Sequence, residues 1–189
     1  TRRLARGLSI ITVALLILGQ AQPALADYNH TGSGQWTTSS LSYYFYGPDG
    51  TYQSPTQAAA TDWNDMSDLT VSATAEGWEK IGVGTGAYGT GFNGRTVICG
   101  VSGTCYSSIP INENFNYAQI DFNTSTTSGW SWGALRALAN HEFGHAFSLW
   151  HVPYCDPVDH IMFTPVTHSC NGGAQYPQPH DIDGVNVRY

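Results

Sequence analysis

The sequence predicts an α/β domain in which a twisted mixed sheet of four to five strands packs against three helices, with a loop-rich lower part after the second helix. Residues 41–46 alternate in polarity and are rich in aromatics, which is typical of a strand. A capping box with proline at the first helical position begins at Ser54 and predicts a helix to about Asp68. A second helix is expected after Ser131, because this residue can cap it and apolar residues then recur at helical spacing.

The remaining strands are expected at residues 69–73, at 78–83, in a hairpin within 96–109, and at 118–123, the last at an edge of the sheet. A strand, a helix and a strand at the start of the domain imply a parallel pair with a right-handed crossover. The glycine-rich run 82–94 matches a dinucleotide-binding fingerprint literally. No helical pattern follows it, so we interpret it as a surface loop.

Each helix is expected to bury one face. The first should direct Ala59, Trp63 and Met66 into the core. In the second, Arg136 and Asn140 should face solvent, opposite an apolar stripe. That stripe consists of Trp132, Leu135, Leu138, Ala139 and Ala146. A polar turn is expected at 124–129, and a final helix should begin near Pro179.

Residues 1–26 are predicted to be a signal peptide, and residues 27–189 a single secreted, extracellular domain. Arginines precede an apolar run at 8–18, and Ala24-Leu25-Ala26 offers a cleavage site between small residues. The apolar run is shorter than a typical transmembrane helix, which favours a cleaved signal peptide. An uncleaved signal anchor is the alternative. Residues 27–35 are polar and are expected to form a flexible lead-in.

The expected mature domain is strongly acidic. The whole chain carries 7 lysines and arginines against 14 aspartates and glutamates, and three of the arginines lie in the leader. Four cations against 14 acids give residues 27–189 a net charge of −10. Because such a surface cannot neutralise a phosphate backbone, we exclude nucleic acid, and after leader cleavage also a membrane, as partners. We expect a monomer.

Four cysteines in a secreted chain predict two disulfides, for which three connectivities exist. Proximity favours Cys99 with Cys105, which would close the end of the hairpin, and Cys155 with Cys170. A metal-thiolate site is the alternative. It is disfavoured because neither pair has the C-x-x-C spacing.

The most specific signal is the pattern H-E-x-x-H-x-x-x-x-x-H, formed by His141, Glu142, His145 and His151. Residues four apart share a helix face, so His141 and His145 can hold one metal ion from the same side. On an unbroken helix, His151 would point away from that ion. The chain must therefore turn sharply after about Phe147 if His151 is the third ligand.

This donor set predicts a catalytic rather than a structural zinc site. Zinc prefers tetrahedral coordination, and three histidines leave its fourth position open for water. The ion would acidify that water and polarise a carbonyl group. Glu142, next to a ligand, is then placed to take the proton from water and pass it to a leaving amine.

The pattern resembles the metzincin zinc endopeptidases, and among them the matrixin-like catalytic domains, whose motif H-E-x-x-H-x-x-G-x-x-H precedes a methionine turn. The three histidines and Glu142 match that motif, and Ser148 stands in place of the glycine. The resemblance implies a zincin-like fold and a secreted endopeptidase acting on polypeptides. It also implies one catalytic Zn²⁺ on His141, His145 and His151, with Glu142 as general base.

Other segments carry the same resemblance. His160-Ile161-Met162-Phe163 resembles the methionine turn, so Met162 would lie beneath the zinc without binding it. Asp181 stands where the family anchors that turn, and residues 36–73 resemble the family's opening strand, helix and strand. An extended peptide would bind beside an edge strand of the sheet.

The chain departs from vertebrate matrixins where these hold a structural zinc. No histidine occurs between His30 and His141, so we expect no second zinc. Ca²⁺ in the glycine-rich run is without support, because Glu113 and Asp121 are the only nearby acids.

Two alternatives remain open. If Ser148 prevents the turn, His160 or Asp156 can serve as the third ligand in place of His151. The second alternative is a secreted binding module for polysaccharide or peptide, with a purely structural zinc. It would use exposed tryptophans, namely Trp36, Trp130, Trp132 and Trp150.

Overall fold

The computed structural model describes residues 34–47, 50–75, 81–107, 112–152, 160–163 and 174–189. The predicted signal peptide and the pair Cys155 and Cys170 lie outside these residues. Within the described part of the chain, no helix has the length and apolar character needed to cross a membrane.

A six-stranded mixed sheet forms one layer of the fold. Its strands are β1 (Ser40–Tyr46), β2 (Thr70–Ala73), β3 (Ile81–Gly86), β4 (Gly94–Gly100), β5 (Cys105–Tyr106) and β6 (Phe115–Asn123). They follow the order β2-β1-β3-β6-β4-β5. The first four in this order run parallel, whereas β4 pairs antiparallel with both β6 and β5. The predicted α/β class is confirmed, with one strand more than expected.

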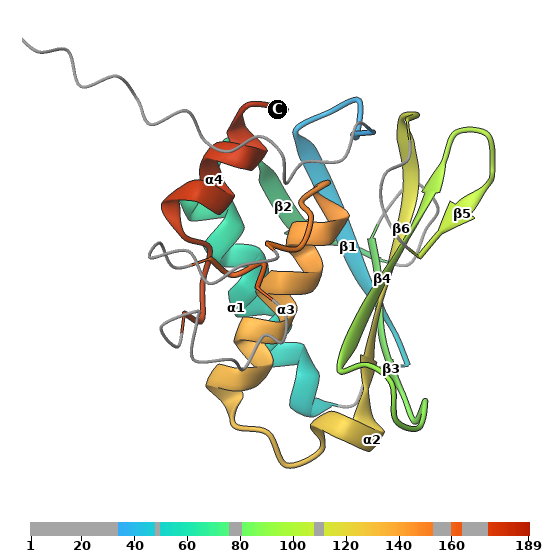
Figure 1. The fold of residues 1–189 in the computed structure, drawn as a ribbon, viewed down its shortest axis with the longest axis vertical. Helices are drawn as coiled ribbons and strands as arrows, with labels where there is room; N and C mark the ends of the chain where they lie inside the picture. The colour runs from blue at the N-terminus through green and yellow to red at the C-terminus, as the bar shows by residue number, and fades with distance from the viewer. Residues whose placement is uncertain (1–33, 48–49, 76–80, 108–111, 153–159, 164–173) are drawn as a thin grey trace, which may run out of the picture.

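The described residues also form four helices. They are α1 (Gly50–Met66), α2 (Thr124–Thr127), α3 (Trp132–Ala146) and α4 (Pro179–Asn186). The two long helices, α1 and α3, lie side by side on one face of the sheet (Figure 1). The single turn α2 occupies the expected polar turn and is capped by Asn123, whose side chain accepts a hydrogen bond from the Ser125 amide.

The hydrophobic core lies between the sheet and the two long helices. Alternate strand residues such as Ile81 and Ile120 point inward, where they are fully buried. Trp63 of α1 meets them with 0% of its surface exposed, and its ring packs edge-on against Phe147. This packing fixes the end of α3, the helix that carries the metal-binding motif.

The polar side of α3 faces α1, contrary to our expectation that it faces solvent. Asn140 is fully buried and donates to Asp62 of α1 at 2.8 Å. Arg136 forms an ion pair with the same carboxylate. A single acid on α1 thus stabilises two polar groups in the helix interface. Conversely, Met66 and Trp132, predicted to face the core, are 37% and 47% exposed.

α1 begins at Gly50, earlier than the capping box predicts. Pro55 therefore lies inside the helix, and Ser54 does not begin it. The Ser54 hydroxyl instead accepts a hydrogen bond from the Trp132 indole at 3.2 Å. Proline has no amide proton, so at this position, in the second turn, it donates no hydrogen bond within the helix.

The first part of the glycine-rich run is strand β3 and not a surface loop. A Cβ atom on Gly82 would stand 2.6 Å from the Tyr117 hydroxyl, and one on Gly84 would stand 2.4 Å from the Tyr46 ring. The glycines thus leave room for tyrosine rings on the outer face of the sheet. β6 is also not at an edge, because β4 pairs with its other side.

Candidate metal centre

α3 presents its two histidines from one face. Its N-cap is Ser131, whose side chain accepts a hydrogen bond from the Ala134 amide at 3.3 Å, as predicted. The helix then runs without interruption through His141 and His145 and ends at Ala146. One helical turn therefore separates the two rings, whose centroids lie 4.7 Å apart.

The chain reverses at Ser148, which has a φ angle of 77°. Among the described residues it is the only non-glycine with a positive φ. The Leu149 amide donates back to the Gly144 carbonyl at 2.9 Å, which closes the turn. The expected sharp turn after Phe147 is therefore confirmed, and serine makes it in the conformation usually reserved for glycine.

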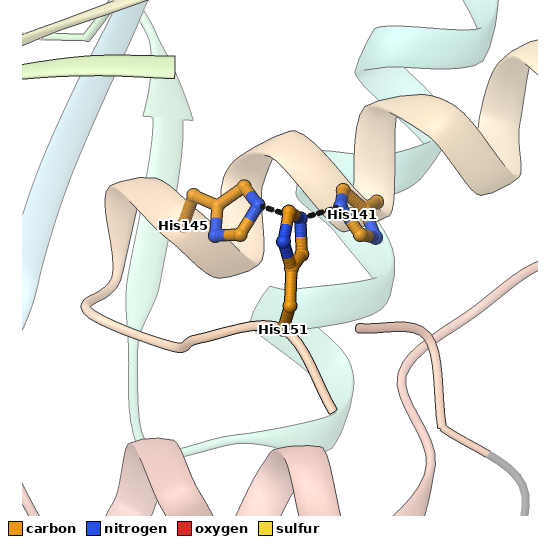
Figure 2. A group of neighbouring side chains, drawn as sticks. All are labelled: His141, His145 and His151. Carbon is orange, nitrogen blue, oxygen red and sulfur yellow. Dashed lines mark hydrogen bonds between the residues drawn. The ribbon is translucent and has the colours of Figure 1, made fainter. Parts of the chain in front are cut away.

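This turn brings His151 to the other two histidines. Its Nε2 lies 3.1 Å from Nε2 of His141 and 3.0 Å from Nε2 of His145. Figure 2 shows the His151 ring rising from the loop after α3 and reaching between the two helical rings. Tetrahedral zinc with nitrogen ligands at about 2.05 Å would hold such atoms ~3.3 Å apart. The observed spacing fits one metal ion with little adjustment.

The second nitrogen of each helical histidine fixes its tautomer. Nδ1 of His141 lies 2.8 Å from the Ile161 carbonyl, and Nδ1 of His145 lies 2.9 Å from the Leu149 carbonyl. Because a carbonyl only accepts, both Nδ1 atoms carry the proton, which leaves a lone pair on each Nε2. Two lone pairs thus converge on His151, whose Nε2 proton can satisfy only one of them. A cation bound by all three is the arrangement this donor set supports.

Electrostatics keep these rings neutral. Burial lowers the pKa of His141 well below its ordinary 6.5, and neighbouring His145 lowers it further. Burial lowers the pKa of His145 to about 4, with His151 adding to the effect. Partial desolvation also lowers the pKa of His151, although this side chain is exposed. Neutral imidazoles are the form that binds a metal, so the triad is ready to bind at neutral pH.

Glu142 lies beside the triad and is 3% exposed. Burial raises its pKa from 4.5 to about 7, while the hydrogen bond from Thr96 acts in the opposite direction. The Thr96 hydroxyl lies 2.7 Å from Oε2 of this carboxylate. A Cβ atom on Gly94 would stand 2.4 Å from Oε1. Sequence reasoning missed both β4 residues, because nothing in a sequence links them to a glutamate more than 40 positions later.

Met162 lies beneath the helix segment that carries the histidines. It is 1% exposed, and a Cβ atom on Gly144 would stand 2.3 Å from its sulfur. The Ile161 amide donates to Asp181 at 2.9 Å, so α4 anchors this turn. This geometry is the one expected for Met162 and Asp181, and the role of Met162 stays a prediction.

His160 does not join the triad. Its Nδ1 lies 3.5 Å from an Asp181 oxygen, and its ring packs against His180 and Phe163. Among the described residues, the histidine triad is the only group of three or more side chains that could hold a metal ion. Asp156, the other alternative ligand, lies outside the described part.

The other residues singled out in the sequence make contacts within the protein and do not join the metal site. Cys99 and Cys105 form the expected disulfide, across the β4–β5 hairpin. Glu113 accepts hydrogen bonds from Ser102, and Asp121 pairs with Arg95 at 2.7 Å. Both acids considered for Ca²⁺ thus already bind groups of the protein.

Of the tryptophans considered for a binding surface, Trp36 is only 5% exposed and Trp132 is the exposed one. Trp130 and Trp150 are partly buried against the core.

Comparison with solved structures gives distant similarity, and comparison with protein families and curated sequences gives none. No protein-family model matches the chain, and no curated protein sequence matches it. A solved structure of myroilysin is similar over 65% of this chain, with a TM-score of 0.45 and 22% sequence identity. The match spans 54% of the myroilysin chain, about half of its length. At this distance the similarity says nothing about activity.

Proposed function

We propose that this chain is a secreted zinc-dependent endopeptidase of the metzincin type, with a matrixin-like catalytic domain in residues 27–189 and a signal peptide in residues 1–26. The observation that carries the proposal is the convergence of three histidine Nε2 atoms beside the buried carboxylate of Glu142. A triad with a neighbouring acid is typical of hydrolytic zinc sites, because three protein ligands leave a position for a reactant.

When bound, zinc supplies Lewis acidity, which polarises a peptide carbonyl and acidifies water at the site. His141 and His145 orient their lone pairs through the Nδ1 hydrogen bonds to backbone carbonyls. Glu142 takes the proton from water and delivers it to the leaving amine. A carboxylate with a pKa near 7 suits both tasks, since it can hold and release a proton at neutral pH.

The outer edge of β4 is the proposed place for the substrate backbone. β5 pairs only with Ile98 and Cys99, so among the described residues the stretch from Gly94 to Val97 has no strand partner on that side. Glu142 lies against the same stretch through Thr96. An extended peptide added to this edge would pass beside the triad and bind through its backbone.

The test is cleavage of an unstructured protein such as casein by the chain, with bound zinc measured on the same sample. The proposal predicts about one zinc per chain and cleavage that a chelator stops and added zinc restores. A chain that binds zinc but cleaves no casein or peptide library would contradict the endopeptidase. A structural zinc in a binding module would then be the better account.

A further inference from the structure

The turn before His151 places a side chain where backbone geometry favours glycine. Ser148 has a φ of 77°, and its side chain is fully buried. A residue with a Cβ atom is strained in this conformation and persists there only when its surroundings hold it. The relevant question is therefore what the serine hydroxyl contributes that glycine would not.

The hydroxyl binds the start of the described chain. Ser148 Oγ donates to the Gly34 carbonyl at 2.6 Å, across 114 positions in sequence. This is a buried hydrogen bond, shielded from competition with water. The segment is thus not the flexible lead-in that its composition predicts, at least at residues 34 and 35. The Phe115 amide donates to the Gln35 carbonyl at 2.8 Å and holds it as well.

Further contacts tie the same segment to the end of α3 and to the residue just after α4. The Trp36 indole donates to the Ala146 carbonyl at 2.9 Å, which caps the last turn of α3. Arg188, just beyond α4, donates to the Gly34 carbonyl at 3.3 Å. Residues 34–36 therefore form a clasp, by which we mean a segment that touches α3 on one side and the C-terminal residues on the other.

We propose that Ser148 is a positioning residue for the third metal ligand, and that its hydrogen bond to Gly34 makes residues 34–36 part of the metal site. The proposal rests on the metal site of the proposed function, but not on peptide cleavage. The bond fixes the left-handed turn, and the turn fixes where His151 meets the two helical histidines. Groups that orient metal ligands in this way typically change metal affinity 10–100-fold when removed.

The competing account makes an opposite prediction for one substitution. If serine is merely tolerated in place of glycine, Ser148→Gly relieves strain and leaves zinc affinity equal or higher. If the hydroxyl positions the turn, Ser148→Gly weakens zinc binding by about tenfold even though the backbone strain is gone. We expect Ser148→Gly to fold, because glycine adopts this φ freely and Arg188 still donates to the Gly34 carbonyl. A loss of zinc affinity would therefore not come from misfolding.

The experiment measures Zn²⁺ affinity by competition with a chromophoric chelator for the full wild-type chain, Ser148→Gly and Ser148→Ala. The visible absorption of the Co²⁺-loaded proteins gives a second readout, because it reports on ligand number and geometry. Ser131→Ala is the matched control. It removes a serine hydroxyl from the other end of α3, where it caps the helix without touching the ligand turn.

We expect both Ser148 variants to bind Zn²⁺ about tenfold more weakly and to show an altered Co²⁺ spectrum. Ser131→Ala should lose stability but keep the wild-type affinity and spectrum. Unchanged affinity and spectrum in Ser148→Gly would overturn the positioning role while leaving the proposed peptidase intact. Equal weakening in Ser131→Ala would overturn it too. A wild-type chain that binds no Zn²⁺ would overturn both this inference and the proposed function.

Discussion

Thr96 of β4 and Glu142 of α3 share a buried hydrogen bond, with 2.7 Å between the threonine hydroxyl and Oε2. The same hydroxyl lies 3.0 Å from the backbone carbonyl of Glu142. The strand thus holds one oxygen of the carboxylate and leaves Oε1 over the α-carbon of Gly94. The proposed general base is therefore positioned by the sheet as well as by its own helix.

Removing this hydroxyl should slow catalysis without weakening substrate binding. We expect Thr96→Val, which keeps the shape of the side chain, to lower kcat by about 10- to 100-fold and to leave KM within about twofold, because a misplaced group costs rate. Thr96→Ser restores the donor and should recover most of the loss. Steady-state kinetics on a fluorogenic peptide measure both. Equal kcat for the valine variant and wild type would contradict this role of the strand.

A methyl group on Gly94 should displace the same carboxylate. The added Cβ would lie 2.4 Å from Oε1, so the side chain of Glu142 must move. Gly94→Ala should therefore lower kcat at least about tenfold while zinc content stays unchanged. Gly91→Ala is the control, because nothing lies within 4 Å of its Cβ position. Similar activity of the two alanine variants would mean that Oε1 has no part in the reaction.

Zinc should stabilise the folded chain, since the converged triad exists only there. With zinc at about 1,000 times its dissociation constant, binding adds about 4 kcal/mol to the free energy of unfolding. A chelator should then lower Tm by roughly 10 °C in a calorimetric scan. The effect should be much smaller in His151→Ala and unchanged in His180→Ala. An unchanged Tm of the wild-type protein after addition of the chelator would argue against a bound metal.

Asp121 should make stability depend on acid pH. Burial alone would raise its pKa, but hydrogen bonds from Arg95, Tyr46, Gln119 and Tyr88 outweigh burial and lower the pKa below 3.8. A lowered pKa means that the folded state favours the carboxylate. Its contribution to stability is therefore present above about pH 4 and is lost as the pH falls through the folded value.

Urea unfolding between pH 3 and 7 checks this. Asp121→Asn should have a lower free energy of unfolding at pH 7 and a shallower loss of stability below pH 4. Asp68→Asn, at an exposed position, should follow the wild-type curve. If Asp121→Asn loses as much unfolding free energy below pH 4 as wild type, other carboxyl groups cause the acid dependence.

Local patterns predicted the parts of the site that lie close together in sequence. The i, i+4 spacing of His141 and His145 and the cap at Ser131 follow from helix geometry alone, and both are present in the structure. The need for a turn before His151 also followed from helix geometry. That serine makes this turn was not predictable, because the bond that holds it comes from Gly34, far away in sequence.

Tertiary packing decided what local patterns could not. The glycine-rich sequence of β3 favours a loop, because the tyrosine rings that cover its glycines come from β1 and β6 and leave no local pattern. The sequence favours solvent exposure for Asn140, because its partner Asp62 lies on another helix. Thr96 and Gly94 carry no sequence signal at all. Each miss has the same physical cause, a partner supplied by a distant element.

The most direct test of the central claim compares zinc content and peptide cleavage in Glu142→Gln and wild type. Glu113→Gln, which lies before β6 and contacts the β4–β5 hairpin through Ser102, is the matched control. The replacement keeps the shape of the side chain but removes the group that accepts a proton. We predict that Glu142→Gln binds about one zinc, like wild type, and loses cleavage by a factor of at least about 100. Glu113→Gln should keep wild-type activity. Wild-type cleavage by zinc-loaded Glu142→Gln would contradict the account.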